Sequence, residues 1–198
     1  MLPQTKNRIS FATENLDKIS EANQILSEFK INLEQANVKK VEIQAEQLEE
    51  IVTFALNMIP NDALPIILED SGLFIDALNG FPGLYSSFVY KKIRCEGVIK
   101  LMEGRQERKA IFISVVGYKS KEKRIFLFRG EIYGNILSST IGKGGFGFDP
   151  IFVPDGNDKT FAQMNIEEKN SFSHRGKAFR KWGEWMRDCQ QNIFKVST

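Results

Sequence analysis

The sequence is poor in the residues that build most transition-metal sites. Its 198 residues include one histidine, His174, and two cysteines, Cys95 and Cys189. The cysteines stand far apart and match no CxxC or Cys/His spacing, so neither a zinc site nor a disulfide framework is expected, and a reducing, intracellular environment is favoured. Any bound metal would have to be held by oxygen ligands, which points to magnesium, manganese or calcium.

A long hydrophobic run is also missing. No segment approaches the roughly 18 consecutive apolar residues of a membrane span, and the first 15 residues lack the apolar core of a signal peptide. We therefore expect a soluble, cytoplasmic protein. A chain of this length buries roughly 70% of the surface that its unfolded form exposes, which is enough for a single domain over residues 1–198.

The net charge is small, but the charges are unevenly distributed. There are 27 Lys and Arg against 25 Asp and Glu, a formal charge of +2. Residues 42–76 contain eight acids and no Lys or Arg, whereas residues 169–187 contain six bases and one acid. An acidic and a basic patch on one domain suit a metal-bound polyanion, although two solvated helix faces would give the same pattern.

The hydrophobic pattern predicts an α/β fold with a central mixed sheet flanked by helices. A βαβαβ unit comes first, with strands at residues 8–13, 38–43 and 64–68 and helices from Ile19 to Phe29 and from Leu48 to Ile59. The later elements are a turn-rich stretch at 73–83, a helix around 96–102, an antiparallel hairpin of 110–118 and 124–136, a strand at 151–153, and a C-terminal helix.

The most visible motif, GKGGFG at residues 142–147, matches the dinucleotide fingerprint GxGxxG. That fingerprint must open a helix whose N-terminus meets the pyrophosphate. Here Asp149-Pro150 follows and leads into a β-like segment, so a dinucleotide site is not expected. The glycines still permit a close approach of the backbone to a ligand.

Three polar motifs are candidates for chemistry. Glu69-Asp70-Ser71-Gly72 closes the expected buried strand, so its carboxylates should emerge at a ligand crevice, although an ordinary turn has the same composition. Thr13-Glu14-Asn15 with Lys18 lies at a strand-to-helix junction and suits either phosphate binding or simple N-capping by Asn15. His174-Arg175 precedes the last helix, where a lone histidine is more often a cap or a surface residue.

Three blocks in this order resemble the inosine triphosphate pyrophosphatase family, also called XTP/dITP diphosphatases. The blocks are residues 11–18, LEDSGLFIDALNGFPGLYS at 68–86, and GFGFDPIFVPDGNDKTFAQMNIEEKNSFSHRG at 145–176. The resemblance implies hydrolysis of ITP, dITP and XTP to the monophosphate and pyrophosphate, with Mg²⁺ or, as a substitute, Mn²⁺, in a cleft between two lobes. It also implies a cytoplasmic homodimer without a stable nucleic-acid or membrane partner.

The same resemblance assigns roles by position. Asp70 matches the general base and a metal ligand, and Glu42 matches the second metal carboxylate, with Glu46 as a rival. The other matched positions are substrate contacts: Thr13, Glu14, Asn15 and Lys18 in the triphosphate-binding turn, Ser71 beside Asp70, Phe146, Gly147, Phe148 and Asp149 around the base and sugar, and Lys169, His174 and Arg175.

One position departs from the family pattern. The family's turn usually has Thr-Gly-Asn, whereas this chain has Thr13-Glu14-Asn15. A carboxylate here would repel a polyphosphate unless it turned to solvent or joined the metal, and the missing glycine limits a backbone with positive φ.

The expected chemistry follows from the charges. Lys18, Lys169 and Mg²⁺ would neutralise charge while water attacks the α-phosphorus and Asp70 accepts its proton. Hypoxanthine and xanthine present an acceptor at the 6-position and adenine presents a donor, so Arg175 or His174, with backbone N–H groups, would favour the former, while Phe146 or Phe148 stacks on the purine.

The sequence is also compatible with other functions. A Maf-like nucleotide pyrophosphatase with a different base preference and a non-catalytic nucleotide-binding sensor, which Glu14 favours, are the two main alternatives. Nucleic-acid binding through the C-terminal basic patch is a third.

Overall fold

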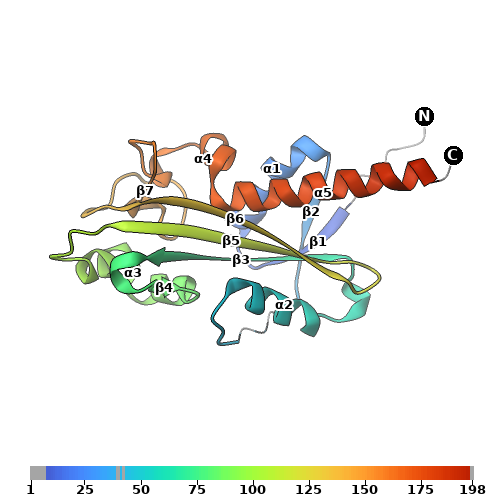
Figure 1. Cartoon of the computed structure of the whole chain (residues 1–198), viewed down its shortest axis with the longest axis horizontal. Helices are drawn as coiled ribbons and strands as arrows, with labels where there is room; N and C mark the ends of the chain where they lie inside the picture. The colour runs from blue at the N-terminus through green and yellow to red at the C-terminus, as the bar shows by residue number, and fades with distance from the viewer. Residues whose placement is uncertain (1–7, 39–40, 42, 197–198) are drawn as a thin grey trace.

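The computed structural model describes residues 8–38, 41 and 43–196, which form a mixed α/β fold around a seven-stranded sheet (Figure 1). The strands are β1 (Arg8–Ala12), β2 (Asn32–Ala36), β3 (Ile66–Ile75), β4 (Pro82–Gly83), β5 (Lys109–Lys119), β6 (Ile125–Ile136) and β7 (Phe152–Pro154). Their order is β2-β1-β3-β5-β6-β7, with β4 paired to β3. The first three strands are parallel and the later ones pair antiparallel, which confirms the expected mixed sheet.

Helices cover the sheet because each carries one apolar stripe. α1 (Leu16–Leu26), α4 (Ile166–Phe172) and α5 (His174–Val196) lie together on one side, and α2 (Leu48–Met58) lies on the other (Figure 1). α3 (Ser86–Leu101) packs at the far end of β3 and β5. The described part of the chain contains no helix that is long and apolar enough to span a membrane.

The predicted strand at residues 38–43 was wrong. Of these residues, 38, 41 and 43 are described and none is in a strand. The second strand comes earlier, because Asn32–Ala36 pairs in parallel register with Arg8–Ala12. The hairpin at 110–118 and 124–136 was correct and is formed by β5 and β6.

β3 is longer than the sequence predicted. It continues from the expected end at Leu68 to Ile75, because β5 pairs with it at every position from Ile66 to Ile75. The motif Glu69-Asp70-Ser71-Gly72 therefore lies in the middle of a strand, and the expectation that it closes the strand was wrong. This places its polar side chains on both faces of the central sheet.

The helices also differ from the expected ones. α3 begins at Ser86, ten residues before the predicted helix, and is interrupted at Arg94, where φ is 56° and ψ is −165°. α4 was not predicted. The loop at 142–147 leads into a short 3-10 turn and β7, which confirms that it opens no dinucleotide-binding helix. The assignment of residues 1–198 to a single domain stays a prediction.

Candidate active site

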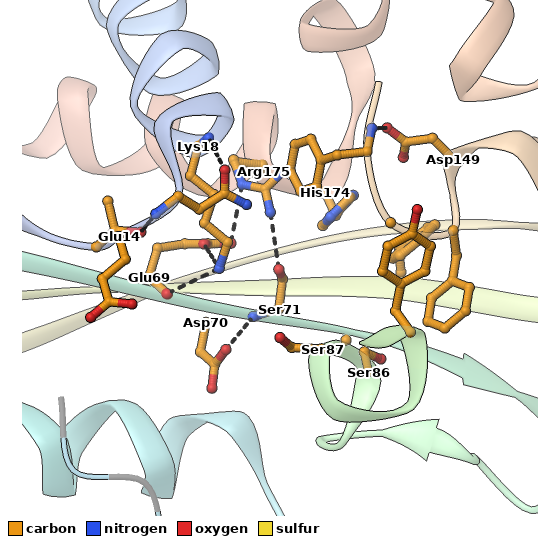
Figure 2. A pocket seen from close by; sticks show the side chains of 18 of the residues that line it. Glu14, Lys18, Glu69, Asp70, Ser71, Ser86, Ser87, Asp149, His174 and Arg175 are labelled. Carbon is orange, nitrogen blue, oxygen red and sulfur yellow. Dashed lines mark hydrogen bonds and ion pairs between the residues drawn. The ribbon is translucent and has the colours of Figure 1, made fainter. Parts of the chain in front are cut away.

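A cavity of about 810 Å³ opens beside the middle of β3. Its walls come from segments far apart in the sequence: the turn before α1, the middle of β3, the first half of α3, the loop at 146–149, and the start of α5. Figure 2 shows their side chains converging on this space. The predicted site residues that line it are Thr13, Glu14, Asn15, Lys18, Asp70, Ser71, Phe146, Gly147, Phe148, Asp149, His174 and Arg175.

Neighbouring residues of β3 present their side chains to opposite faces of the sheet. Glu69 and Ser71 both bond Arg175, the first to Nε at 3.2 Å and the second to Nη2 at 3.0 Å. Because strand side chains alternate, Asp70 points to the other face (Figure 2). Its Oδ1 accepts the backbone N–H of Ser71 at 3.0 Å. Both carboxylates border the cavity, but the Glu69 side chain is fully buried against cations on one face of the strand, whereas Asp70 lies on the other face.

Glu69 is the buried carboxylate. Its side chain has no exposed surface, and it lies 2.8 Å from Lys18 Nζ while the Ser114 hydroxyl donates to it at 2.6 Å. Burial alone would raise the pKa of Glu69, but Arg175 and Lys18 outweigh it and hold the pKa far below the usual range. Glu69 is therefore ionised and fixes two cations at the cavity wall.

The turn before α1 behaves as a helix cap. Asn15 Oδ1 accepts the backbone N–H groups of Asp17 and Lys18 at 2.9 and 3.4 Å, and Thr13 Oγ1 accepts that of Asn15 at 3.2 Å. The capping alternative is thus correct for Asn15, and the same turn lines the cavity. Glu14 is exposed, lies outside the positive-φ region, and points away from the Lys18–Glu69–Arg175 cluster (Figure 2). The turn forms without the family's glycine.

The loop at 146–149 is shaped by two glycines and one carboxylate. Gly145 and Gly147 have φ of 66° and 64°, which favour glycine. Asp149 Oδ2 accepts the backbone N–H of Phe146 at 2.9 Å. Phe148 is 3% exposed and packs edge-on against Tyr90, with 5.4 Å between the ring centroids. Phe146 is only half-buried, so of the two phenylalanines it is the one that keeps more exposed surface.

Lys169 lies behind the cavity, outside its lining. Its Nζ is 2.6 Å from Asp149 Oδ2 and 2.8 Å from Glu21 Oε1, and the residue is 3% exposed. Two carboxylates therefore neutralise its charge. Burial raises the pKa of Asp149 in spite of the adjacent ammonium. The prediction that Lys169 contacts the substrate is untested, and its position favours an indirect role.

His174 and Arg175 begin α5 and form the inner wall. The His174 ring stacks on Phe112 at 4.7 Å, and its Nδ1 is buried without a hydrogen-bond partner among the described residues. Burial, with Arg175 and Lys169 nearby, lowers the pKa of His174 well below its ordinary value, so the imidazole is neutral at pH 7. Burial would lower the pKa of Arg175, but Glu69 and Glu21 outweigh it and raise the pKa.

The donor set suits a hard divalent metal. Mg²⁺ is commonly bound by one or two carboxylates together with substrate phosphates and water, and the Asp70 carboxylate lines the cavity. Glu42, the second predicted ligand, lies outside the described residues, and its rival Glu46 does not line the cavity. Among residues 8–38, 41 and 43–196, no three His, Cys, Asp or Glu side chains gather into a ready-made metal cluster.

Two groups of residues were missed by the sequence analysis. The first half of α3 lines the cavity with Ser86, Ser87, Tyr90, Lys91 and Arg94. Glu21, on the buried side of α1, contacts both Lys169 and Arg175. A signal existed for Glu21, since it stands four positions before the apolar Ile25, on the face that α1 should bury.

The sequence is similar to proteins of known family. A model of the Ham1 family matches residues 9–185. The dITP/XTP pyrophosphatase of Methanopyrus kandleri is 47% identical over 182 residues, covering 91% of this chain and 97% of the relative. The dITP/XTP pyrophosphatase of Pyrococcus horikoshii is 46% identical over 181 residues, again covering 91% and 97%.

Solved structures show the same fold. The Ham1 protein of Staphylococcus aureus superposes with a TM-score of 0.77 at 27% identity, covering 91% of this chain and 98% of that one. A Ham1 protein from Coxiella burnetii gives a TM-score of 0.78 at 28% identity with the same coverage.

Proposed function

Since this chain belongs to the Ham1 family, we propose that it hydrolyses the triphosphates of non-standard purines, ITP, dITP and XTP, to the monophosphate and pyrophosphate. It is a nucleoside triphosphate pyrophosphatase. One observation carries the proposal for this chain's own residues. The Asp70 carboxylate shares one cavity with the turn before α1 and with the loop at 146–149, so one substrate can meet all three.

Asp70 is the general base in this proposal. It accepts a proton from the water that attacks the α-phosphorus, and the bridging bond to the β-phosphorus breaks to release pyrophosphate. Of the two adjacent carboxylates, only Asp70 is suited to this task, because Glu69 is committed to Lys18 and Arg175. Lys18 holds phosphate oxygens at the start of α1.

A divalent metal is the proposed cofactor, with Mg²⁺ first and Mn²⁺ as a substitute. Asp70 would hold it, with Glu42 as the second proposed ligand. When bound, such a metal neutralises phosphate charge and makes water more acidic. Glu14 is exposed at the cavity wall, which allows its carboxylate to remain in solvent while the triphosphate binds.

We assign the selection of the purine base to His174 and Arg175, which form the inner wall of the cavity. Arg175 donates only, so its guanidinium matches the 6-oxo group of hypoxanthine or xanthine and opposes the 6-amino group of adenine. The neutral His174 has an unused buried Nδ1 for a further hydrogen bond. The ring of Phe146 provides the stacking surface.

The proposal also covers the cellular location and the oligomeric state of the protein. We infer a cytoplasmic enzyme that acts as a homodimer, without a stable nucleic-acid partner and with no attachment to a membrane. Gel filtration with light scattering checks the dimer at micromolar concentration.

A pyrophosphate-release assay tests the function. Purified protein with Mg²⁺ is given ITP, dITP, XTP, GTP, ATP and dTTP. We expect kcat/KM for ITP and XTP to exceed that for GTP and ATP by at least about tenfold. No turnover of any substrate with either metal would favour a silent sensor, and a preference for dTTP would favour a Maf-like activity. Release of orthophosphate would contradict attack at the α-phosphorus.

A further inference from the structure

Glu21 sits at the junction of two parts of the candidate site without touching the cavity. It lies in α1, is 4% exposed, and is absent from the cavity lining. Each of its carboxylate oxygens has its own cation: Oε1 is 2.8 Å from Lys169 Nζ, and Oε2 is 2.6 Å from Arg175 Nη1. One buried side chain thus holds two cations from different helices.

Glu21 is connected through Lys169 to the loop at 146–149, and we call this chain of contacts the Lys169 arm. Lys169 Nζ contacts Asp149 Oδ2 at 2.6 Å, and the same oxygen accepts the backbone N–H of Phe146 at 2.9 Å. Lys169 Nζ also lies 4.8 Å from the centre of the Phe146 ring. The position of the stacking ring therefore depends on Lys169, which Glu21 holds from behind.

Glu21 is also connected to Arg175, which we propose contacts the 6-position of the purine base, and we call this second chain of contacts the Arg175 arm. With Nη1 on Glu21 and Nε on Glu69, the guanidinium has one orientation, which directs Nη2 to Ser71 Oγ at 3.0 Å in the cavity wall. Its central carbon is 5.1 Å from the centre of the Phe146 ring. The two arms end at the same place, with a cation and an aromatic ring facing each other.

Charge balance explains why one acid serves both arms. The cations Lys18, Lys169 and Arg175 are matched by three carboxylates, which are Glu21, Glu69 and Asp149. Burial would raise the pKa of Glu21, but Arg175 and Lys169 outweigh it and lower the pKa, so the carboxylate is ionised. Without this charge, Arg175 and Lys169 would repel each other across a low-dielectric space.

We propose that Glu21 is a positioning residue that sets the base selectivity of the enzyme, by fixing the distance between the Arg175 guanidinium and the Phe146 ring. This inference rests on the proposed function, since it concerns how that activity separates 6-oxo from 6-amino purines. A misplacement of the guanidinium by about 1 Å loses the hydrogen bond that distinguishes the two bases. Proton transfer at Asp70 lies outside the two arms.

The test compares Glu21→Gln with wild type on ITP and ATP. Glutamine keeps the size of the side chain and removes its charge. We expect the ratio of kcat/KM for ITP to that for ATP to fall about tenfold, mainly through a higher KM for ITP. This ratio does not depend on the fraction of folded enzyme, so a purely structural role for Glu21 would leave it unchanged. A ratio within twofold of wild type overturns the inference.

Two further variants complete the experiment. Glu28→Gln is the matched control, because Glu28 forms an exposed pair with Arg180 at 3.4 Å, outside the cavity; its ratio should equal that of wild type. Glu21→Asp keeps the charge and should recover part of the ITP-to-ATP ratio of kcat/KM. If the Glu21→Gln variant does not fold, Glu21→Asp takes its place in the comparison with wild type. If wild type itself fails to prefer ITP, the proposed function is wrong, whereas a preference that survives in both Glu21 variants contradicts only the present inference.

Discussion

Glu69 and Asp70 are adjacent carboxylates on β3 that point to opposite faces of the sheet. Both border the cavity, but the Glu69 side chain is fully buried between Lys18 and Arg175, whereas Asp70 lies on the opposite face of the strand. Glu69 therefore holds two cations in place, whereas Asp70 is the acid that we propose faces the substrate. Substitutions at the two positions should consequently separate stability from turnover.

Asp70→Asn should abolish turnover and leave the fold intact. Loss of a general base lowers kcat by about 10²- to 10⁴-fold. We expect a change of less than about 1 kcal/mol in the free energy of unfolding, because the replacement is isosteric and lies at the cavity wall. Single-turnover rates with ITP and urea unfolding measure the two effects.

Glu69→Gln should destabilise the fold. Removing the charge from a fully buried carboxylate with two cationic partners should lower the free energy of unfolding by about 3 kcal/mol. Urea unfolding at pH 7 measures this loss. A variant as stable as wild type would contradict the role of Glu69 as the anchor of Lys18 and Arg175.

The single histidine should give the stability a recognisable pH dependence. Its pKa in the folded state is far below that of the unfolded chain, about 6.5. Below pH 6.5 the unfolded state therefore binds a proton that the folded state does not, and the free energy of unfolding falls by up to about 1.4 kcal/mol per pH unit. Above pH 6.5 this contribution is fully present.

Thermal unfolding between pH 5.5 and 7.5 measures the effect. His174→Gln has no group that titrates in this window at that position, so the difference between the two proteins isolates the histidine. Parallel curves for wild type and His174→Gln would contradict a neutral, buried imidazole.

Lys119→Met should destabilise the protein without changing its selectivity. The buried ammonium of Lys119 donates to the carbonyl oxygens of Leu56 and Ile59, at 2.9 and 3.2 Å, at the C-terminal end of α2. Methionine fills similar space but removes the ammonium donor from both carbonyls, and only Leu56 keeps another donor, the backbone N–H of Ile59 at 3.3 Å. The loss should cost about 1 to 3 kcal/mol. Urea unfolding compares it with Lys121→Met, an exposed position where no loss is expected.

Arg94→Gly should stabilise the fold. Arg94 adopts φ of 56° and ψ of −165° inside α3, a conformation that glycine adopts readily and other residues do not. Relief of this strain should exceed the entropy that glycine adds to the unfolded chain, for a net gain of about 1 kcal/mol. Arg94→Ala removes the same side chain without the relief, so its melting temperature should lie below that of Arg94→Gly.

The sequence predicted those parts of the site that depend on local chemistry. The turn at Thr13 to Lys18 and the acid at Asp70 were selected for their residue types, and the loop at 146–149 was selected through the family resemblance. All three border one cavity, and their roles stay predictions. The extent of β3 was missed because Glu69 to Gly72 has the composition of a turn, and only pairing with β5 keeps it extended. Propensity was overridden by a partner strand more than forty positions away.

Other misses have the same origin. Glu21 and Lys169 form a buried ion pair although they are 148 positions apart in the sequence, and no local pattern predicts such a pairing. The lining by α3 depends on a helix that begins ten residues earlier than its apolar pattern predicted. Tertiary contacts, which periodicity does not encode, decided each case.

The pairing of Glu21 with Arg175, 154 positions apart, has a consequence for biosynthesis. An emerging polypeptide carries the turn before α1 and the β3 strand with Asp70 long before Arg175 has been made. Until Arg175 has been synthesised and α5 docks, Glu21 and Glu69 lack the guanidinium that they share in the folded protein. The buried charge cluster at the cavity wall is therefore completed only when the last helix joins the fold.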